Sequence, residues 1–261
     1  MSLDRVGFIL VAALVASALL LAPAPAAAQA EQSVLTGGGV ENQPPPKGPT
    51  PRAKDGKPDL SGVWGPDRRF IYDINSALKP GETLPIQPWA ADLTKKHLSK
   101  DDPEANCLPT GVPRMAPYPW KIVQTPTLVI FLFEGNIHSY RQIFLDGRGH
   151  PKDPDPTWYC DSIGHWDGDT LVVDSIGFND KFWFDFAGHP HTEKLHITER
   201  YRRTDLGHLE SEVTIDDPGA YTKPFTMYGH FPLQTNTEIM EYICNENNQD
   251  VSHIVGKDSR K

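Results

Sequence analysis

The residues that could carry chemistry are concentrated in three long polar segments, 146–158, 177–193 and 216–223. They include imidazoles and carboxylates, which are the common general acids and bases of enzymes, and aromatic rings. These residues are Arg148, His150 and Trp158; Asp180, Trp183, Asp185, His189, His191 and Glu193; and Asp216, Asp217 and Tyr221. Long irregular segments of a compact domain are usually functional, so we expect a site for a small organic molecule here.

The first hypothesis is a cofactor-independent enzyme of lyase, isomerase or hydrolase type. His191 precedes Glu193 by two residues, close enough in an extended segment for one side chain to orient the other. His150 is the second expected proton carrier, and Arg148 or Tyr221 would stabilise a developing oxyanion. The sequence contains no Gly-x-Ser-x-Gly nucleophile motif, and its glycines match neither a phosphate loop nor a dinucleotide fingerprint.

Two other functions remain open. A metal-dependent enzyme would bind zinc or copper through His150, His189 and His191, although their spacing matches no established zinc motif. A non-catalytic, lipocalin-like carrier would hold an apolar or aromatic ligand inside a barrel, and its pocket would be lined by Phe131, Phe133, Tyr140 and Tyr201. The residues expected to contact a phenolic or carbohydrate-like substrate are Trp158, Trp183, Asp180, Tyr201, Phe131 and Tyr140. The density of ionisable groups favours an enzyme.

The elements that must position these residues are antiparallel strands. Tight turns are expected at 134–136 (EGN), 167–169 (DGD) and 205–207 (DLG), with apolar runs on either side. No helical crossovers separate the runs, which predicts eight to ten strands in an up-and-down, lipocalin-like barrel, with a β-sandwich as the alternative. Successive connections of such a sheet alternate ends. We therefore expect the three turns at one end and the three polar segments at the other.

Three hairpins have predicted registers. In 127–145 a two-residue turn at Gly135-Asn136 pairs Phe131 with Tyr140. In 194–216 a three-residue turn ending in a left-handed Gly207 pairs Arg202 with Glu210, and it leaves Glu199 on the apolar face, where a carboxylate needs a partner. In the middle hairpin, a turn at Asp167-Gly168 would oppose two aspartates, at 161 and 174, and a change of register by one residue removes this repulsion.

Composition divides the chain into three parts. Residues 1–30 have a weakly basic start, an apolar run and small residues at Ala28 and Ala30, which predicts a signal peptide cleaved there. The Pro-rich stretch 31–58 is expected to be a disordered linker, and 59–261 a single domain with one helix near 88–98. The net charge of −9 argues against nucleic acid or anionic lipid as a partner. We expect a periplasmic or secreted protein without stable membrane insertion.

The three cysteines are Cys107, Cys160 and Cys244. An oxidising compartment favours one disulfide. Cys107 and Cys244 flank the strand region, so we predict that they pair and that Cys160 stays free, although the sequence alone allows all three pairings.

Several strings resemble a family of exported, β-rich bacterial proteins whose reaction is not assigned. They are residues 58–64 (PDLSGVW), 107–114 (CLPTGVPR), 146–151 (DGRGHP), 166–174 (WDGDTLVVD) and 190–193 (PHTE). The resemblance covers nearly the whole chain after the expected signal peptide. Family members often have Gly at the position of Cys160, which fits a free thiol, and His at the position of Asn245. In addition, Gly62 and Trp64 resemble the Gly-x-Trp that closes lipocalin barrels.

Overall fold

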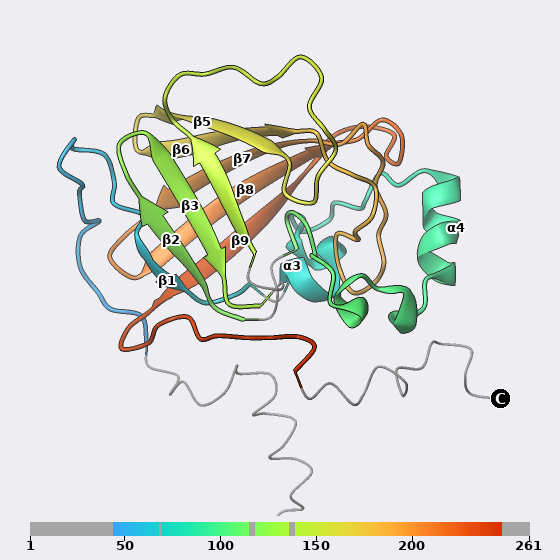
Figure 1. Ribbon diagram of the computed structural model, residues 1–261, viewed down its shortest axis with the longest axis horizontal. Coiled ribbons are helices and arrows are strands. Elements are labelled where there is room, and N and C mark those ends of the chain that lie inside the picture. Colours follow the sequence, from blue (N-terminus) through green and yellow to red (C-terminus); the bar gives the residue numbers. More distant parts are fainter. Residues whose placement is uncertain (1–43, 68, 115–117, 136–138, 247–261) are drawn as a thin grey trace, which may run out of the picture. The chain divides into compact units, whose positions relative to one another are not determined.

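The computed structural model describes residues 44–67, 69–114, 118–135 and 139–246, so the expected signal peptide lies outside the described residues. Nine strands form a closed barrel in chain order, with the last strand returning to the first (Figure 1). They are β1 (Gly62–Trp64), β2 (Trp120–Gln124), β3 (Leu128–Phe133), β4 (Tyr140–Phe144), β5 (Asp161–Asp167), β6 (Thr170–Ile176), β7 (His196–Arg203), β8 (His208–Asp216) and β9 (Phe225–Gln234). The predicted all-β, lipocalin-like barrel is confirmed.

One neighbouring pair of strands is parallel. An odd number of strands cannot alternate in direction all the way around a closed barrel, and here β4 runs parallel to β5, with Phe144 opposite Ile163. Connection 145–160 therefore runs from one end of the barrel to the other (Figure 1). The turn after β3 lies at the same end as connections 177–195 and 217–224. The expectation that all three tight turns share an end is wrong for this turn.

We call that end the loop end, and we call the opposite end, which has the turns at 168–169 and 204–207, the turn end. The long connection between β1 and β2 also lies at the loop end, because β1 runs toward it and β2 runs away from it. This connection contains α3 (Arg69–Tyr72), η1 (Ile74–Ala77), α4 (Pro88–Lys96), η2 (Ser99–Asp101) and η3 (Glu104–Asn106). Helix α4 matches the predicted helix, which starts at the Pro whose fixed φ suits a first turn.

The register predicted for the β3–β4 hairpin is wrong by one residue. Phe131 lies opposite Arg141, and Leu132 lies opposite Tyr140. A shift of one residue moves every side chain of a strand to the other face. Arg141 therefore points into the barrel, where it is 2 % exposed, and Tyr140 lies on the outer surface, where it is 57 % exposed.

The other two hairpins follow the predicted logic. In β7–β8, Arg202 lies opposite Glu210, and Glu199 faces the interior opposite Val213, as expected. In β5–β6 the turn lies one residue later in the chain than in the register that would oppose two aspartates. Asp161 therefore pairs with Ile176 instead of an aspartate. The cost of opposed carboxylates is thus avoided by the register itself.

Gly207 is required for a reason other than the predicted one. It is not among the described glycines with positive φ, so a left-handed turn is wrong for this residue. A Cβ at Gly207 would instead lie 2.3 Å from the carbonyl oxygen of Pro46. The Pro-rich segment approaches the turn this closely, and Leu206 N–H donates to the Gly48 carbonyl at 3.0 Å. Residues 44–58 of the predicted linker therefore contact the turn end of the barrel.

Trp64 and Arg203 close the turn end from inside. Trp64 is fully buried, and its indole N–H donates to the Leu60 carbonyl at 3.1 Å. The Arg203 guanidinium lies 5.0 Å from the centroid of the Trp64 ring and donates to the Asp59 carbonyl at 2.6 Å. The expectation drawn from Gly-x-Trp, a Trp at a closed barrel end, agrees with this arrangement.

The predicted disulfide joins Cys107 to Cys244, with 5.6 Å between the two Cα atoms. It attaches the segment after β9 to the connection between β1 and β2. Cys160 is free, as predicted. Within the described part of the chain, no helix has the length and apolar character needed to cross a membrane.

Candidate functional site at the loop end

Connection 177–195 covers the loop end with its own aromatic core. Phe178, Phe182 and Phe184 are at most 1 % exposed. The Phe182 ring lies 6.2 Å from the Phe178 ring and 6.4 Å from the Phe184 ring, measured between centroids. Gly111 permits the close approach of Phe182, because a Cβ there would lie 2.4 Å from that ring. This packing holds the polar side chains of the connection in fixed positions.

His191 lies within this aromatic core and is 4 % exposed. Its ring centroid is 4.0 Å from that of Phe182 and 5.0 Å from that of Phe184. Nδ1–H donates to the Thr192 carbonyl at 3.2 Å, and Nε2 is buried with no hydrogen-bond partner among the described residues. Burial lowers the pKa of His191 to about 4. The imidazole is therefore neutral at neutral pH, and Glu193, which is exposed, has no hydrogen bond to it in the described residues.

His189, two residues earlier, is held by a carboxylate. Its Nδ1 lies 2.6 Å from Asp185 Oδ2. Asp185 is fully buried, and it also accepts N–H bonds from Ile74 at 2.8 Å, Gly188 at 3.0 Å and His189 at 3.1 Å. Four donors thus fix the carboxylate, which in turn fixes the imidazole with Nδ1 protonated. Nε2 is then the basic nitrogen of His189.

Asp73, Asp185 and His189 could together hold a cation, since one ligand atom from each lies within 4.8 Å of the others. His189 belongs to the predicted zinc or copper set. The other two members have different partners: His191 lies among phenylalanines, and His150 lies on the barrel wall. The Asp185 oxygens already accept four N–H bonds, so a metal there would compete with hydrogen bonds that organise the loop.

His150 lies on the outer face of β5 and β6 between two carboxylates. Its Nδ1 is 2.5 Å from Asp161 Oδ1, and its Nε2 is 2.9 Å from Asp174 Oδ1. His196 Nε2 also bonds to Asp174, at 3.0 Å. These hydrogen bonds lower the pKa of Asp174, although burial opposes them and is the largest single effect. His150 therefore anchors connection 145–160 to the barrel, and it shares no partner with His191.

Arg148 and Tyr221, two further residues of the expected catalytic set, each form a hydrogen bond with a residue that lies next to them. Arg148 donates to Asp146 at 2.9 Å and stacks over the Phe144 ring at 3.8 Å. The hydroxyl of Tyr221, which is 1 % exposed, donates to the Pro190 carbonyl at 3.0 Å. Tyr221 thus supports the backbone next to His191, and burial raises its pKa well above the usual value.

The expected substrate-binding residues are divided between the loop end and other places. Trp183 stacks on His97 with 4.2 Å between centroids, and Trp158 lies 6.4 Å from Phe182, so both belong to the loop-end packing. Asp180 is exposed in the same connection. Phe131 and Tyr201 pack edge to face inside the barrel, 5.3 Å apart, whereas Tyr140 lies outside it.

The barrel interior contains an ion pair that the sequence reasoning missed. Arg141 on β4 binds Glu199 on β7, with 2.9 Å between Nη1 and Oε1, and both side chains are at most 2 % exposed. Tyr201 donates to Glu199 at 2.7 Å, and Arg141 also donates to Ser162 at 3.1 Å and Ser175 at 2.7 Å. A signal was present, because Glu199 on an apolar face required a partner, but the wrong β3–β4 register placed Arg141 outside.

Cys160 borders this interior network without being a reactive thiol. Its Sγ lies 3.2 Å from Ser162 Oγ. Burial raises the pKa of Cys160 to about 11, although the nearby Arg141 opposes the shift. The neutral thiol dominates at neutral pH, so the network fills and stabilises the barrel rather than supplying a nucleophile.

Comparison of the chain with protein-family models, with curated proteins and with solved structures finds no match.

Proposed function

We propose that this protein is an exported enzyme that acts on a small organic molecule by acid–base chemistry at the loop end of the barrel. The observation that carries the proposal is the Asp185–His189 pair, in which a fully buried carboxylate holds Nδ1 of an imidazole at 2.6 Å. In such a pair the carboxylate orients the ring and stabilises the imidazolium that forms when Nε2 accepts a proton. This pair replaces the His191–Glu193 pair expected from the sequence.

The proposed proton transfer has a defined direction. His189 Nε2 removes a proton from the bound molecule, and the resulting imidazolium is stabilised by Asp185 until the proton is returned or passed to a leaving group. His191 is unsuited to this role, because burial keeps it neutral and lowers its basicity. The reaction is of lyase, isomerase or hydrolase type, and Trp183 and Trp158, which belong to the loop-end packing, suit a phenolic or carbohydrate-like substrate.

Export to the periplasm or the medium is part of the proposal. It is supported by the Cys107–Cys244 disulfide, since such bonds persist mainly in oxidising compartments, and by the apolar run in residues 6–21. The acidic net charge supports a small molecule rather than nucleic acid as the partner.

The variant His189→Gln tests the proposed base. Turnover of aryl esters, aryl glycosides and phenolic compounds would be measured for the native protein, for this variant and for the control His196→Gln, which changes a half-exposed histidine on the outer barrel face. We expect a loss of about 10²–10⁴-fold in rate for His189→Gln only, the usual contribution of a general base. Full turnover by His189→Gln would overturn the proposal.

The pair can also be tested without a substrate. A proton shared between His189 Nδ1 and Asp185 should give a low-field proton NMR resonance that disappears in His189→Gln and persists in His196→Gln. Activity that is abolished by a chelator and restored by zinc or copper would instead favour a metal-dependent reaction.

A further inference from the structure

A second candidate site lies beside the disulfide, at the edge of the loop end. It is a cavity of about 550 Å³ between the connection that contains η2 and η3, the start of β2, connection 177–195 and the segment after β9. Its lining residues are Tyr72, Ser99, Asp102, Glu104, Ala105, Tyr118, Phe186 and Tyr242. Half of these residues are aromatic, and the only charged ones are two carboxylates.

Two pairs of aromatic rings form the walls. Tyr72 and Phe186 have centroids 5.7 Å apart, and Tyr118 and Tyr242 have centroids 5.2 Å apart. Tyr72 is 43 % exposed and Phe186 is 42 % exposed, although large apolar side chains of this kind are commonly buried in a core. The faces of aromatic rings carry partial negative charge, so a group of exposed rings attracts a cation.

The charge of the cavity has the matching sign. Among the described residues, Asp102 and Glu104 share a single cation, Arg114, whose Nη2 lies 2.9 Å from Asp102 and 2.6 Å from Glu104. These three side chains therefore have a net charge of −1 when ionised. Glu104 is the more exposed carboxylate, and burial raises its pKa although Arg114 opposes the shift. A cation in the cavity would remove this cost of burying an unbalanced carboxylate.

Arg114 shows that one of these rings accepts a cation. Its guanidinium lies 4.1 Å from the centroid of the Phe186 ring, on a side chain that is only 1 % exposed. The guanidinium is buried and does not line the cavity, so it is unavailable as a binding group. The remaining rings, Tyr72, Tyr118 and Tyr242, have no described cation over them.

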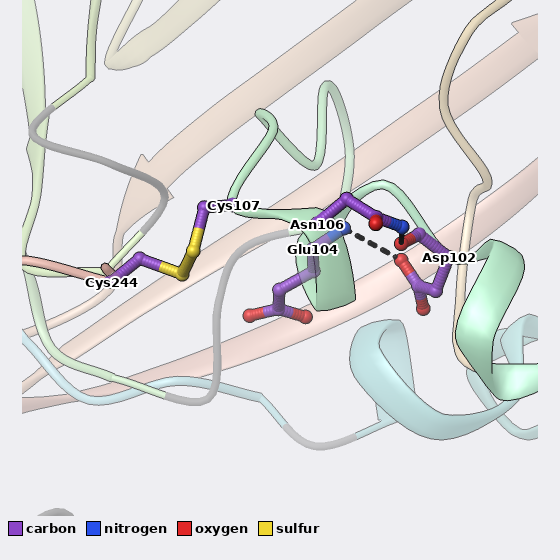
Figure 2. The surroundings of a disulfide bond; sticks show 5 residues. All are labelled: Asp102, Glu104, Asn106, Cys107 and Cys244. Carbon is purple, nitrogen blue, oxygen red and sulfur yellow. Dashed lines mark hydrogen bonds between the residues drawn. A yellow bond between two sulfur atoms is a disulfide. The ribbon is translucent and has the colours of Figure 1, made fainter. Parts of the chain in front are cut away.

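The disulfide holds the cavity together. Figure 2 shows Cys107 joined to Cys244 next to η3, with Asp102 and Glu104 on the same short segment. The Glu104 N–H donates to Asp102 Oδ1 at 3.0 Å, which orients both residues. Because Cys244 lies two residues after Tyr242, the bond fixes an aromatic wall against a segment 137 residues away in sequence.

We propose that this cavity binds a small organic cation, a quaternary ammonium or an alkylamine, between the tyrosine rings and beside Glu104. The three tyrosine rings supply cation–π contacts, Glu104 supplies the counter-charge, and the volume lies within the usual range of small-molecule sites, about 300–1,000 Å³. The proposal concerns binding, and it does not depend on the reaction proposed for His189.

Choline and its neutral isostere 3,3-dimethylbutan-1-ol provide the direct test, because they share shape and differ in charge. Isothermal titration of the purified full chain should show saturable choline binding and at least tenfold weaker binding of the alcohol. Glu104→Gln keeps a hydrogen-bond acceptor for Arg114 and removes the charge, and Tyr242→Leu removes one ring. Each variant should weaken choline binding about tenfold, whereas Tyr140→Leu, on the outer barrel face, should leave it unchanged.

Three outcomes would overturn the proposal. The first is equal affinity for choline and the alcohol, which would indicate an apolar pocket. The second is unchanged choline binding in both Glu104→Gln and Tyr242→Leu, with melting temperatures near that of the native protein, which would place the ligand elsewhere. The third is the absence of saturable binding of choline and of benzyltrimethylammonium up to about 10 mM.

Discussion

At the scale of single residues, two histidines separated by one proline have opposite chemical characters. His189 is held by the buried carboxylate of Asp185, which fixes the orientation of its ring. His191 is surrounded by Phe182 and Phe184, which stabilise only the neutral ring. The difference lies entirely in the atoms that the fold places around each ring, and it moves the proposed base from His191 to His189.

The burial of His191 predicts a specific dependence of stability on pH. Its pKa is about 4 in the folded protein and 6.5 in the unfolded chain. As the pH falls below 6.5, the unfolded chain binds a proton that the folded protein does not, so stability is complete above pH 6.5 and falls toward pH 4. The shift corresponds to roughly 3 kcal/mol.

His191→Phe should remove this component, and urea unfolding at several pH values between 4 and 7.5 would measure it. The control is His208→Gln, which changes an exposed histidine at the turn end. The contradicting outcome is a native protein that loses stability between pH 6.5 and pH 4 no more steeply than His191→Phe does. That result would show that His191 is not buried as described.

Gly207 and Gly168 give a second prediction at this scale. Gly207→Ala should destabilise the protein by more than about 1 kcal/mol, because its Cβ would lie 2.3 Å from the Pro46 carbonyl oxygen. Gly168 has φ of +58° and open space around it, so Gly168→Asn should be tolerated within about 0.5 kcal/mol. Thermal melting of both variants is the measurement, and a neutral Gly207→Ala would contradict the packing of the Pro-rich segment on the turn.

At the scale of elements, the Arg141–Glu199 pair connects β4 to β7 across the barrel interior. The two strands are separated in the sheet by β5 and β6, whose Ser162 and Ser175 also bind Arg141. The pair therefore links four strands near the parallel β4–β5 contact, where the backbone pairing is limited to a single residue pair. Its removal should weaken this part of the barrel first.

Glu199→Leu alone should cost about 3–5 kcal/mol, because it leaves the Arg141 guanidinium buried without its counter-charge. The double variant Arg141→Met/Glu199→Leu should cost clearly less than the sum of the two single variants, since it leaves no unpaired charge. Guanidinium unfolding of the four proteins gives this coupling. Additive costs would show that the two side chains do not act as a pair.

At the scale of the whole molecule, the Cys107–Cys244 bond closes a loop that includes eight of the nine strands. Removing it in Cys107→Ser/Cys244→Ser should lower the free energy of unfolding by up to about 5 kcal/mol in the chain-entropy model. The same double variant should lose choline binding, because Tyr242 is no longer held at the cavity.

Cys160→Ser is the matched control, since it changes the free cysteine and keeps a polar atom near Ser162. Titration calorimetry and melting curves of both proteins would separate the two effects. Unchanged choline binding in the double variant, together with a lowered melting temperature, would mean that the bond stabilises the fold without shaping the cavity.

Features that depend on local patterns could be predicted from the amino-acid sequence. The barrel class, helix α4, the β7–β8 register and the disulfide followed from turn residues, alternation and cysteine position. The β3–β4 register did not follow, because the length of its turn decides which face each residue takes, and an error of one residue moved Arg141 outside.

The side chains that meet at each site depend on contacts between distant parts of the chain. Asp185 becomes an orienting carboxylate because Ile74, 111 positions earlier, donates to it, and Tyr242 and Glu104 line one cavity because a disulfide joins distant segments. His150 and His191 both lie in long polar segments of the sequence, but the folded protein places them in different surroundings. The parallel β4–β5 pair, which an odd number of strands requires, carries connection 145–160 along the barrel wall. Contacts between residues far apart in sequence leave no periodic signal, so local reasoning could locate the loop end but not the atoms that meet there.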